Sequence, residues 1–141
     1  MDLSIKLNDT KVNIRVAGLV KTPRGYLFEK NEKGYIFALG GRVMLNESSE
    51  KAMVREIMEE IGMKVDKLSL SAMIENFYST ATEKVHEICF VYKIETLFMD
   101  KIPFEFVEVP INEINKYDVR PSQIIDILKN GKGPFSHIIV K

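Results

Sequence analysis

Alternating apolar and polar positions mark several strands along the chain. Residues 12–20 alternate, residues 22–25 form a turn and residues 26–30 are again mostly apolar, a pattern typical of a β-hairpin. Further strands are predicted at residues 35–39, 68–78, 85–95, 104–109 and 137–140. Because helical segments interrupt these strands, we expect an α/β fold, an α/β/α sandwich with a central mixed β-sheet.

The clearest helix is predicted over residues 49–61. Ser48 and Ser49 offer N-cap hydroxyls, Glu50 places an acid in the first turn, and Gly62 can adopt the left-handed conformation that ends a helix. The helical period places the apolar residues on one side, which we expect to face the core: Met53, Val54, Ile57, Met58 and Ile61. The opposite side carries Ala52, Glu56, Glu59 and Glu60.

Two shorter helical segments are predicted after residue 110. The first is a turn near residues 111–116, after Pro110 ends a strand. The second spans residues 121–129, with Pro121 in its first turn and Gly131 closing it.

The acids of the predicted helix 49–61 suggest a cation site. Glu56 and Glu60 are four residues apart, so both carboxylates project from one stripe. At a separation of about 6 Å and an effective dielectric near 20, they repel by roughly 3 kcal/mol. Carboxylate oxygens without a nearby Cys or His suit Mg²⁺, Mn²⁺ or Ca²⁺ better than Zn²⁺. The helix therefore resembles half of a site for a diphosphate and a metal ion.

An acid cluster alone is more often a solvated helix face, with Arg55 and Glu59 forming an exposed pair. The preceding segment changes this interpretation. Gly40 and Gly41 follow an apolar run, and we expect this run to be a strand that ends at the glycine pair. A loop-sized interval separates the pair from Glu47. A glycine pair lets the backbone approach a ligand or an ion closely.

Residues 41–63 match the signature of the Nudix hydrolases without a gap or a substitution. The signature is a glycine, five residues, a glutamate, seven residues, then Arg-Glu-U-x-Glu-Glu-x-Gly-U, where U is aliphatic; here it runs from Gly41 through Glu47 to Met63. The chain thus resembles the MutT-like Nudix hydrolases. The resemblance implies an α/β/α sandwich and a Mg²⁺-dependent or Mn²⁺-dependent nucleotide pyrophosphatase, which cleaves the diphosphate linkage of a nucleoside diphosphate joined to another group X.

The resemblance also implies roles for individual residues. Glu56 and Glu60 would be the principal metal ligands, with Glu59 and the backbone carbonyl of Gly40 as further ligands. Arg55 would hold the site together by pairing with Glu47, and Glu59 or a later acid would activate the attacking water. The number of metal ions and the identity of the general base stay open.

Two positions depart from the pattern of many relatives. Leu39 stands where proline is common before the glycine pair, and Asn46 stands where glycine is common before the loop glutamate. Asparagine tolerates a left-handed backbone, so we expect Asn46 to preserve the turn.

Substrate choice lies outside the signature. Phe77 and Tyr78 are candidates for stacking on a base, although aromatic residues on a strand more often belong to the core or the sheet surface, and Arg42 is a further candidate for substrate binding. Glu87, Glu105 or Glu108 could serve as an acid near the metal ion. The substrate is expected to be a small nucleotide derivative. The sequence does not distinguish among ADP-ribose, dinucleoside polyphosphates, nicotinamide dinucleotides and nucleoside triphosphates.

Two rival functions use the same scaffold. Some Nudix-like domains sense nucleotide derivatives without cleaving them, but those commonly lose the acids that are present here. Isomerases of this scaffold require further catalytic residues, including a cysteine. The single cysteine, Cys89, lies in an apolar run and is expected to be a small buried residue.

Composition sets the remaining limits. The 141 residues fit one Nudix hydrolase domain, residues 1–141, and 20 Lys and Arg balance 20 Asp and Glu. The balanced charge makes polymeric nucleic acid an unexpected partner. The start of the chain lacks the apolar core of a signal peptide and no run is long enough to cross a membrane, so a cytoplasmic protein without a membrane partner is expected. Members of this family are often dimers, and whether this chain forms a homodimer stays open.

Overall fold

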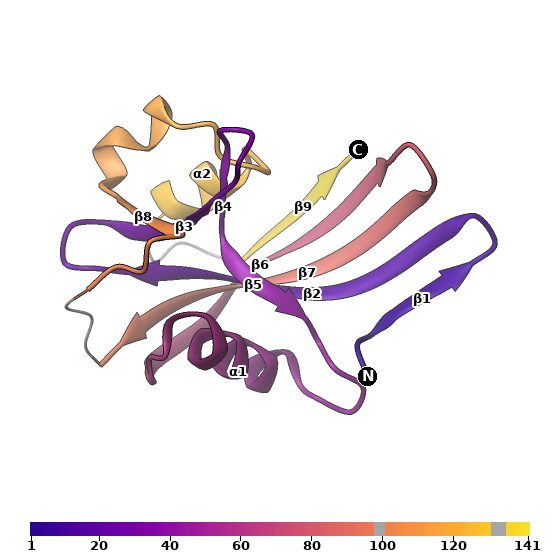
Figure 1. Ribbon diagram of the computed structural model, residues 1–141, viewed down its shortest axis with the longest axis horizontal. Helices are drawn as coiled ribbons and strands as arrows, with labels where there is room; N and C mark the ends of the chain where they lie inside the picture. The colour runs from indigo at the N-terminus through magenta and orange to yellow at the C-terminus, as the bar shows by residue number, and fades with distance from the viewer. Residues whose placement is uncertain (98–100, 131–134) are drawn as a thin grey trace.

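The computed structural model describes residues 1–97, 101–130 and 135–141. In these ranges nine strands form one mixed sheet (Figure 1). They are β1 (Ser4–Leu7), β2 (Thr10–Lys21), β3 (Tyr26–Lys30), β4 (Ile36–Phe37), β5 (Leu39–Arg42), β6 (Val65–Ser79), β7 (Lys84–Thr96), β8 (Phe106–Val109) and β9 (Ser136–Val140). The helical elements are α1 (Ser49–Ile61), the 3₁₀ helix η1 (Ile111–Lys116) and α2 (Ile124–Lys129).

The sheet has the order β4-β3-β2-β7-β6-β9, and β1 and β5 also pair with β2 while β8 pairs with β3. The β2–β7 and β6–β9 pairs are parallel and the others are antiparallel. Strand β2 lies at the centre because it pairs along its whole length with β7 and, on its other edge, with β1, β5 and β3 in turn.

Helices cover both faces of this sheet, which confirms the expected α/β/α sandwich (Figure 1). Alternate residues of the strands point to opposite faces. On the α1 face, Val16, Val20 and Ile94 pack with Met53 and Ile57 of the helix. On the other face, a second cluster includes Leu19, Phe28, Ile74, Val91, Ile114 and Ile127.

Most predicted elements are present, with shifted ends. The hairpin of β2 and β3 is confirmed, and β6 and β7 extend further than the predicted strands 68–78 and 85–95. Strand β8 starts at Phe106 rather than at residue 104. Helix α2 starts at Ile124, so the prediction that Pro121 lies in its first turn is wrong. The predicted closing residue Gly131 lies outside the described residues.

No helix within the described ranges is long and apolar enough to span a membrane.

Candidate active site

Local signals fix both ends of α1. The Ser48 hydroxyl accepts a hydrogen bond from the Lys51 amide at 3.2 Å, and Gly62 adopts the left-handed conformation with φ 67°. These are the two caps that the sequence predicts, and the helix spans the predicted residues.

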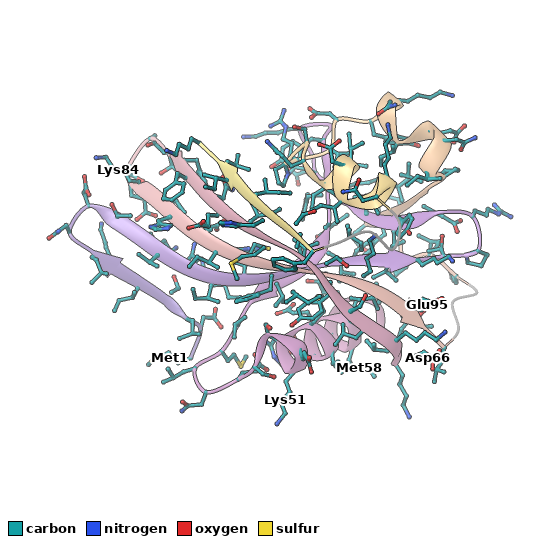
Figure 2. All side chains as sticks on the ribbon, turned by 180° about the vertical axis from the view of Figure 1, so that it is seen from behind. Met1, Lys51, Met58, Asp66, Lys84 and Glu95 are labelled. Carbon is teal, nitrogen blue, oxygen red and sulfur yellow. The ribbon has the colours of Figure 1, made fainter. Side chains whose placement is uncertain are left out.

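The buried face of α1 differs from the predicted one. Val54 and Met58 were expected in the core but are 43% and 46% exposed, while Ala52 and Glu56 are buried beside Met53. The apolar residues of this helix cover more of its circumference than the sheet can bury. The helix is rotated so that Glu56 meets the sheet, and this orientation leaves one edge of the apolar stripe in solvent (Figure 2 labels Met58 on the outer side of α1).

Strand β5 leaves room for the Glu56 carboxylate because it contains the glycine pair. A Cβ atom on Gly41 would lie 2.6 Å from Glu56 Cδ, and a Cβ atom on Gly40 would overlap the backbone carbonyl of Val16. The expectation that the pair ends a strand is wrong, since both glycines lie inside β5 and pair with β2. The absence of a side chain lets the Glu56 carboxylate approach Gly41 and lets the Val16 backbone approach Gly40.

Arg55 joins the helix to the preceding loop. Its Nε and Nη2 donate to the two carboxylate oxygens of Glu47 at 2.8 and 2.9 Å, and Nη2 also donates to the backbone carbonyl of Arg42 at 3.1 Å. Its Nη1 lies 2.9 Å from Glu56 Oε1 and 3.3 Å from Glu59 Oε2. One guanidinium thus orients three carboxylates and a strand end, as planar bidentate pairing allows.

The loop glutamate is held by further local contacts. Glu47 Oε1 also accepts a hydrogen bond from the Met44 amide at 3.0 Å. Hydrogen bonds from Arg55 and then from Met44 lower the pKa of Glu47 to about 2, and pairing with Glu47 raises the pKa of Arg55. Asn46 has φ 66°, so the expectation that it preserves the left-handed turn is confirmed.

Glu60 is the carboxylate that the protein itself satisfies least. Burial, followed by the negative charge of Glu29, raises the pKa of Glu60 to about 8, and Glu56 and Glu59 act in the same direction. Its Oε2 atom is buried and has no hydrogen-bond partner among the described residues. Glu29, on β3, was missed by the sequence reasoning, because only the tertiary fold brings its charge near Glu60.

The chemistry of these donors fits a divalent cation. The mutual repulsion of Glu56, Glu59 and Glu60, and a buried oxygen without a partner among the described residues, are features that a hard cation would relieve. In the described part of the chain, however, no three His, Cys, Asp or Glu side chains already form a cluster that could hold a metal ion. Glu56 instead accepts a hydrogen bond from Arg55, and Glu59 is 55% exposed.

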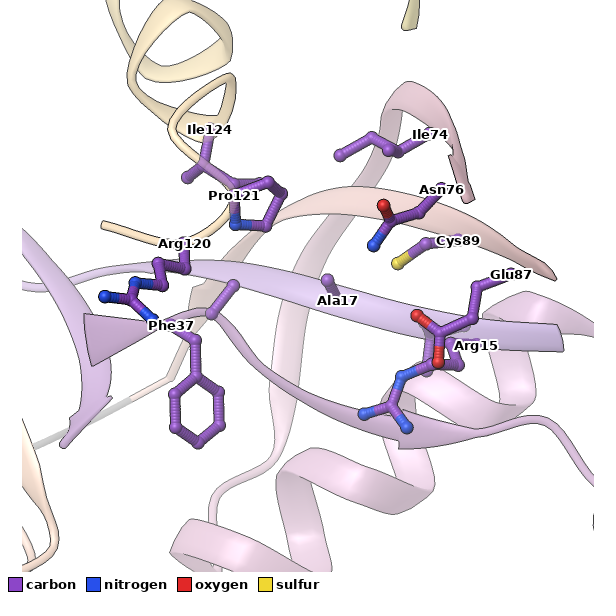
Figure 3. A pocket seen from close by; sticks show the side chains of 12 residues that line it. Arg15, Ala17, Phe37, Ile74, Asn76, Glu87, Cys89, Arg120, Pro121 and Ile124 are labelled. Atoms are coloured by element: carbon purple, nitrogen blue, oxygen red, sulfur yellow. The ribbon is translucent and has the colours of Figure 1, made fainter. Parts of the chain in front are cut away.

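A cavity of about 150 Å³ lies on the sheet face opposite α1 (Figure 3). Phe37, Ala38 and Pro121 line one side, and Arg15 and Glu87 line the other. The cavity wall also contains Val16 and Ala17 of β2, which pair with Gly41 and Gly40 respectively. The sheet at β2 and β5 therefore lies between α1 and this cavity.

The three residues predicted to bind substrate lie in different surroundings. The Phe77 ring stacks on His86 at a centroid distance of 4.4 Å. The Tyr78 hydroxyl lies 3.4 Å from Glu87 Oε1. Successive strand residues point to opposite faces, so Phe77 and Tyr78 lie on opposite sides of β6. The Arg42 guanidinium lies 3.8 Å from Asp2. Burial, followed by the negative charge of Glu87, raises the pKa of Tyr78, and Arg42 opposes this shift only weakly.

The later acids are also separated. Glu87 lines the cavity, and Glu108 accepts a hydrogen bond from the Arg24 amide at 3.2 Å. Glu105 lies near Glu29: burial, followed by the negative charge of Glu105, raises the pKa of Glu29.

Cys89 is packed against the core, and burial raises the pKa of its thiol to about 12. The thiol is therefore poorly suited to act as a nucleophile.

Comparisons with known proteins agree with this geometry. The family model described as NUDIX domain matches residues 15–127. The MutT protein of Bacillus halodurans is similar in structure, with 18% identity, 89% of each chain covered and a TM-score of 0.69.

Two further solved structures show the same fold. A NUDIX hydrolase of Nitrosomonas europaea has 20% identity and a TM-score of 0.69, covering 92% of this chain and 79% of its own. An ADP-ribose pyrophosphatase of Streptococcus suis has 10% identity and a TM-score of 0.61, covering 89% of this chain and 98% of its own. The comparison with curated proteins gave no match.

Proposed function

The chain belongs to the Nudix hydrolase family, and from this premise we propose that it hydrolyses the diphosphate linkage of a nucleoside diphosphate joined to another group X. Mg²⁺ is the proposed cofactor, with Mn²⁺ as a substitute. One observation carries the proposal: the Oε2 atom of Glu60 is buried near the charges of Glu29 and Glu56 and has no hydrogen-bond partner among the described residues. A protein gains no stability from such an arrangement, so a bound cation explains it better than packing does.

The proposed ligands are Glu56, Glu60, Glu59 and the backbone carbonyl of Gly40. When bound, a divalent cation neutralises phosphate oxygens and makes a coordinated water more acidic. Glu56 accepts its hydrogen bond from Arg55 through Oε1, so its Oε2 can bind the cation while this hydrogen bond is kept. The two hydrogen bonds from Arg55 to Glu47 keep the helix and the loop joined.

Glu59 is the proposed residue for orienting or deprotonating the attacking water. Its side chain is 55% exposed, and its contacts with Arg55 are long, at 3.3 and 3.5 Å. It is therefore free to accept a proton from water next to the acids. Arg55 and Glu47 act as positioning residues, and we propose no covalent intermediate, since charge neutralisation and positioning dominate phosphoryl transfer.

The cavity opposite α1 is the proposed site for the nucleoside. Its volume of about 150 Å³ is of the size that holds a small aromatic group. The sheet lies between this cavity and the acids, and we propose that the substrate reaches both around the edge at β5, which pairs with β2 alone among the described strands. Arg42, Tyr78 and Phe77 remain proposed substrate contacts. Phe77 lies on the opposite face of β6 from Tyr78.

The whole chain is proposed to act as one domain. The matched region covers residues 15–127, and the segments on either side join the same sheet. Strand β1 pairs with β2, and β9 pairs with β6.

A panel of nucleoside diphosphate derivatives, assayed for phosphate-containing products with and without Mg²⁺, tests the function. Glu56→Gln and Glu60→Gln should lose turnover, while Glu50→Gln, an exposed acid on the same helix, should keep it. Turnover by Glu60→Gln equal to that of the wild type would remove this residue from the mechanism. Tight binding of a panel member without any turnover would favour the alternative, a sensor of nucleotide derivatives.

A further inference from the structure

The polar end of the cavity carries hydrogen-bonding groups that the protein leaves unused. Glu87 on β7, Asn76 on β6 and Arg15 on β2 line this end, and Figure 3 shows their side chains around the same space. Within the described residues, neither the Asn76 amide nor the Arg15 guanidinium has a hydrogen-bond partner. Polar groups on a cavity wall that lack protein partners are suited to binding a polar ligand.

Glu87 is only half satisfied. Its Oε1 atom lies 3.2 Å from the Asn13 side-chain nitrogen and 3.4 Å from the Tyr78 hydroxyl. Both contacts are made to this one oxygen, and no donor from the described part of the chain reaches Oε2. Because both contacts involve Oε1, they leave Oε2 available to a ligand.

A carboxylate that faces a cavity prefers a particular kind of ligand edge. When ionised it accepts hydrogen bonds and cannot donate them, so it favours an N–H group and disfavours a carbonyl oxygen. A side-chain amide such as Asn76 offers a donor and an acceptor side by side, which matches a base edge where an amino group adjoins a ring nitrogen. The two side chains together favour an exocyclic amino group.

We propose that Glu87 is a specificity-determining residue, whose Oε2 accepts a hydrogen bond from an exocyclic amino group of the substrate base. The site would then prefer amino-bearing bases over otherwise identical bases that lack the amino group. This inference rests on the proposed function, because it assumes that the nucleoside enters this cavity.

Matched substrates isolate the amino group. Guanine and hypoxanthine derivatives with the same diphosphate and the same X differ only at the 2-amino group, and adenine and unsubstituted purine derivatives differ only at the 6-amino group. For at least one pair, the wild type should show a kcat/KM that is about tenfold to a hundredfold higher for the amino-bearing member. This ratio does not depend on the fraction of folded enzyme, so partial misfolding of a variant cannot imitate the result.

Glu87→Gln should reduce the ratio to about threefold or less, because an amide can present its donor to a base that lacks the amino group. Glu95→Gln is the matched control, since Glu95 is an exposed acid on the same strand and should leave the ratio unchanged. Ratios near one for both pairs in the wild type, or an unchanged ratio in Glu87→Gln, would overturn the inference. Failure to hydrolyse any derivative would instead contradict the proposed function, so the two failures are distinguishable.

Discussion

The pair of Arg55 and Glu47 gives the most quantitative prediction of stability. Glu47→Gln removes a carboxylate that accepts two hydrogen bonds from Arg55, at 2.8 and 2.9 Å. The pKa of Glu47 falls from 4.5 to about 2 on folding, which corresponds to roughly 3 kcal/mol at neutral pH. The side chains of Glu47 and Arg55 are 15% and 22% exposed, so solvent screening reduces the expected loss of stability to about 2 kcal/mol.

The sign of the pH dependence follows from the lowered pKa. Glu47 stabilises the folded protein fully above the unfolded pKa of 4.5, and this stabilisation is lost as the pH falls towards about 2. The difference in free energy of unfolding between the wild type and Glu47→Gln should therefore be largest at pH 7 and shrink progressively below pH 4.5.

Urea denaturation at a series of pH values measures this difference. Glu113→Gln is the control, because Glu113 pairs with Lys116 at 3.7 Å and both side chains are largely exposed. This control should lose less than about 0.5 kcal/mol. The reasoning is refuted if Glu47→Gln costs no more than Glu113→Gln at pH 7, or if its cost stays constant in acid.

Three further substitutions test the local geometry. Gly41→Ala should reduce kcat/KM about a hundredfold, because its methyl group displaces the Glu56 carboxylate; unchanged steady-state kinetics would contradict this close approach. Gly62→Ala should lower the free energy of unfolding by about 1 kcal/mol, since φ is 67° there, and denaturation at pH 7 measures it. Ser48→Ala should cost about 1 kcal/mol through loss of the hydrogen bond from the Lys51 amide, with Ser48→Thr as the variant that keeps the cap.

Features coded by neighbouring residues could be predicted from the sequence. The caps Ser48 and Gly62 act within one helical turn, so they predict both ends of α1. The signature also places Arg55 and Glu47 eight residues apart across one loop, and the left-handed turn at Asn46 brings them together. In each case the partners are close in sequence.

Features that depend on packing between distant segments could not be predicted in this way. Glu29 affects Glu60 only because the tertiary fold brings β3 and α1 into one domain, and nothing in its own strand indicates this. The polar end of the cavity combines Arg15, Asn76 and Glu87 from three strands, whose register sets their proximity. The helix period also failed to identify the buried face of α1, because a site that buries Glu56 breaks the rule that apolar residues point inward.

Mg²⁺-dependent thermal stability tests the central claim most directly, because it does not require the substrate. Without Mg²⁺, Glu60→Gln should be at least as stable as the wild type, since it replaces a carboxylate whose buried Oε2 has no partner in the described part of the chain. Added Mg²⁺ should raise the Tm of the wild type and of Glu50→Gln, and leave that of Glu60→Gln unchanged. An equal rise in Glu60→Gln, or no rise in the wild type, would contradict a cation held by the acids of α1.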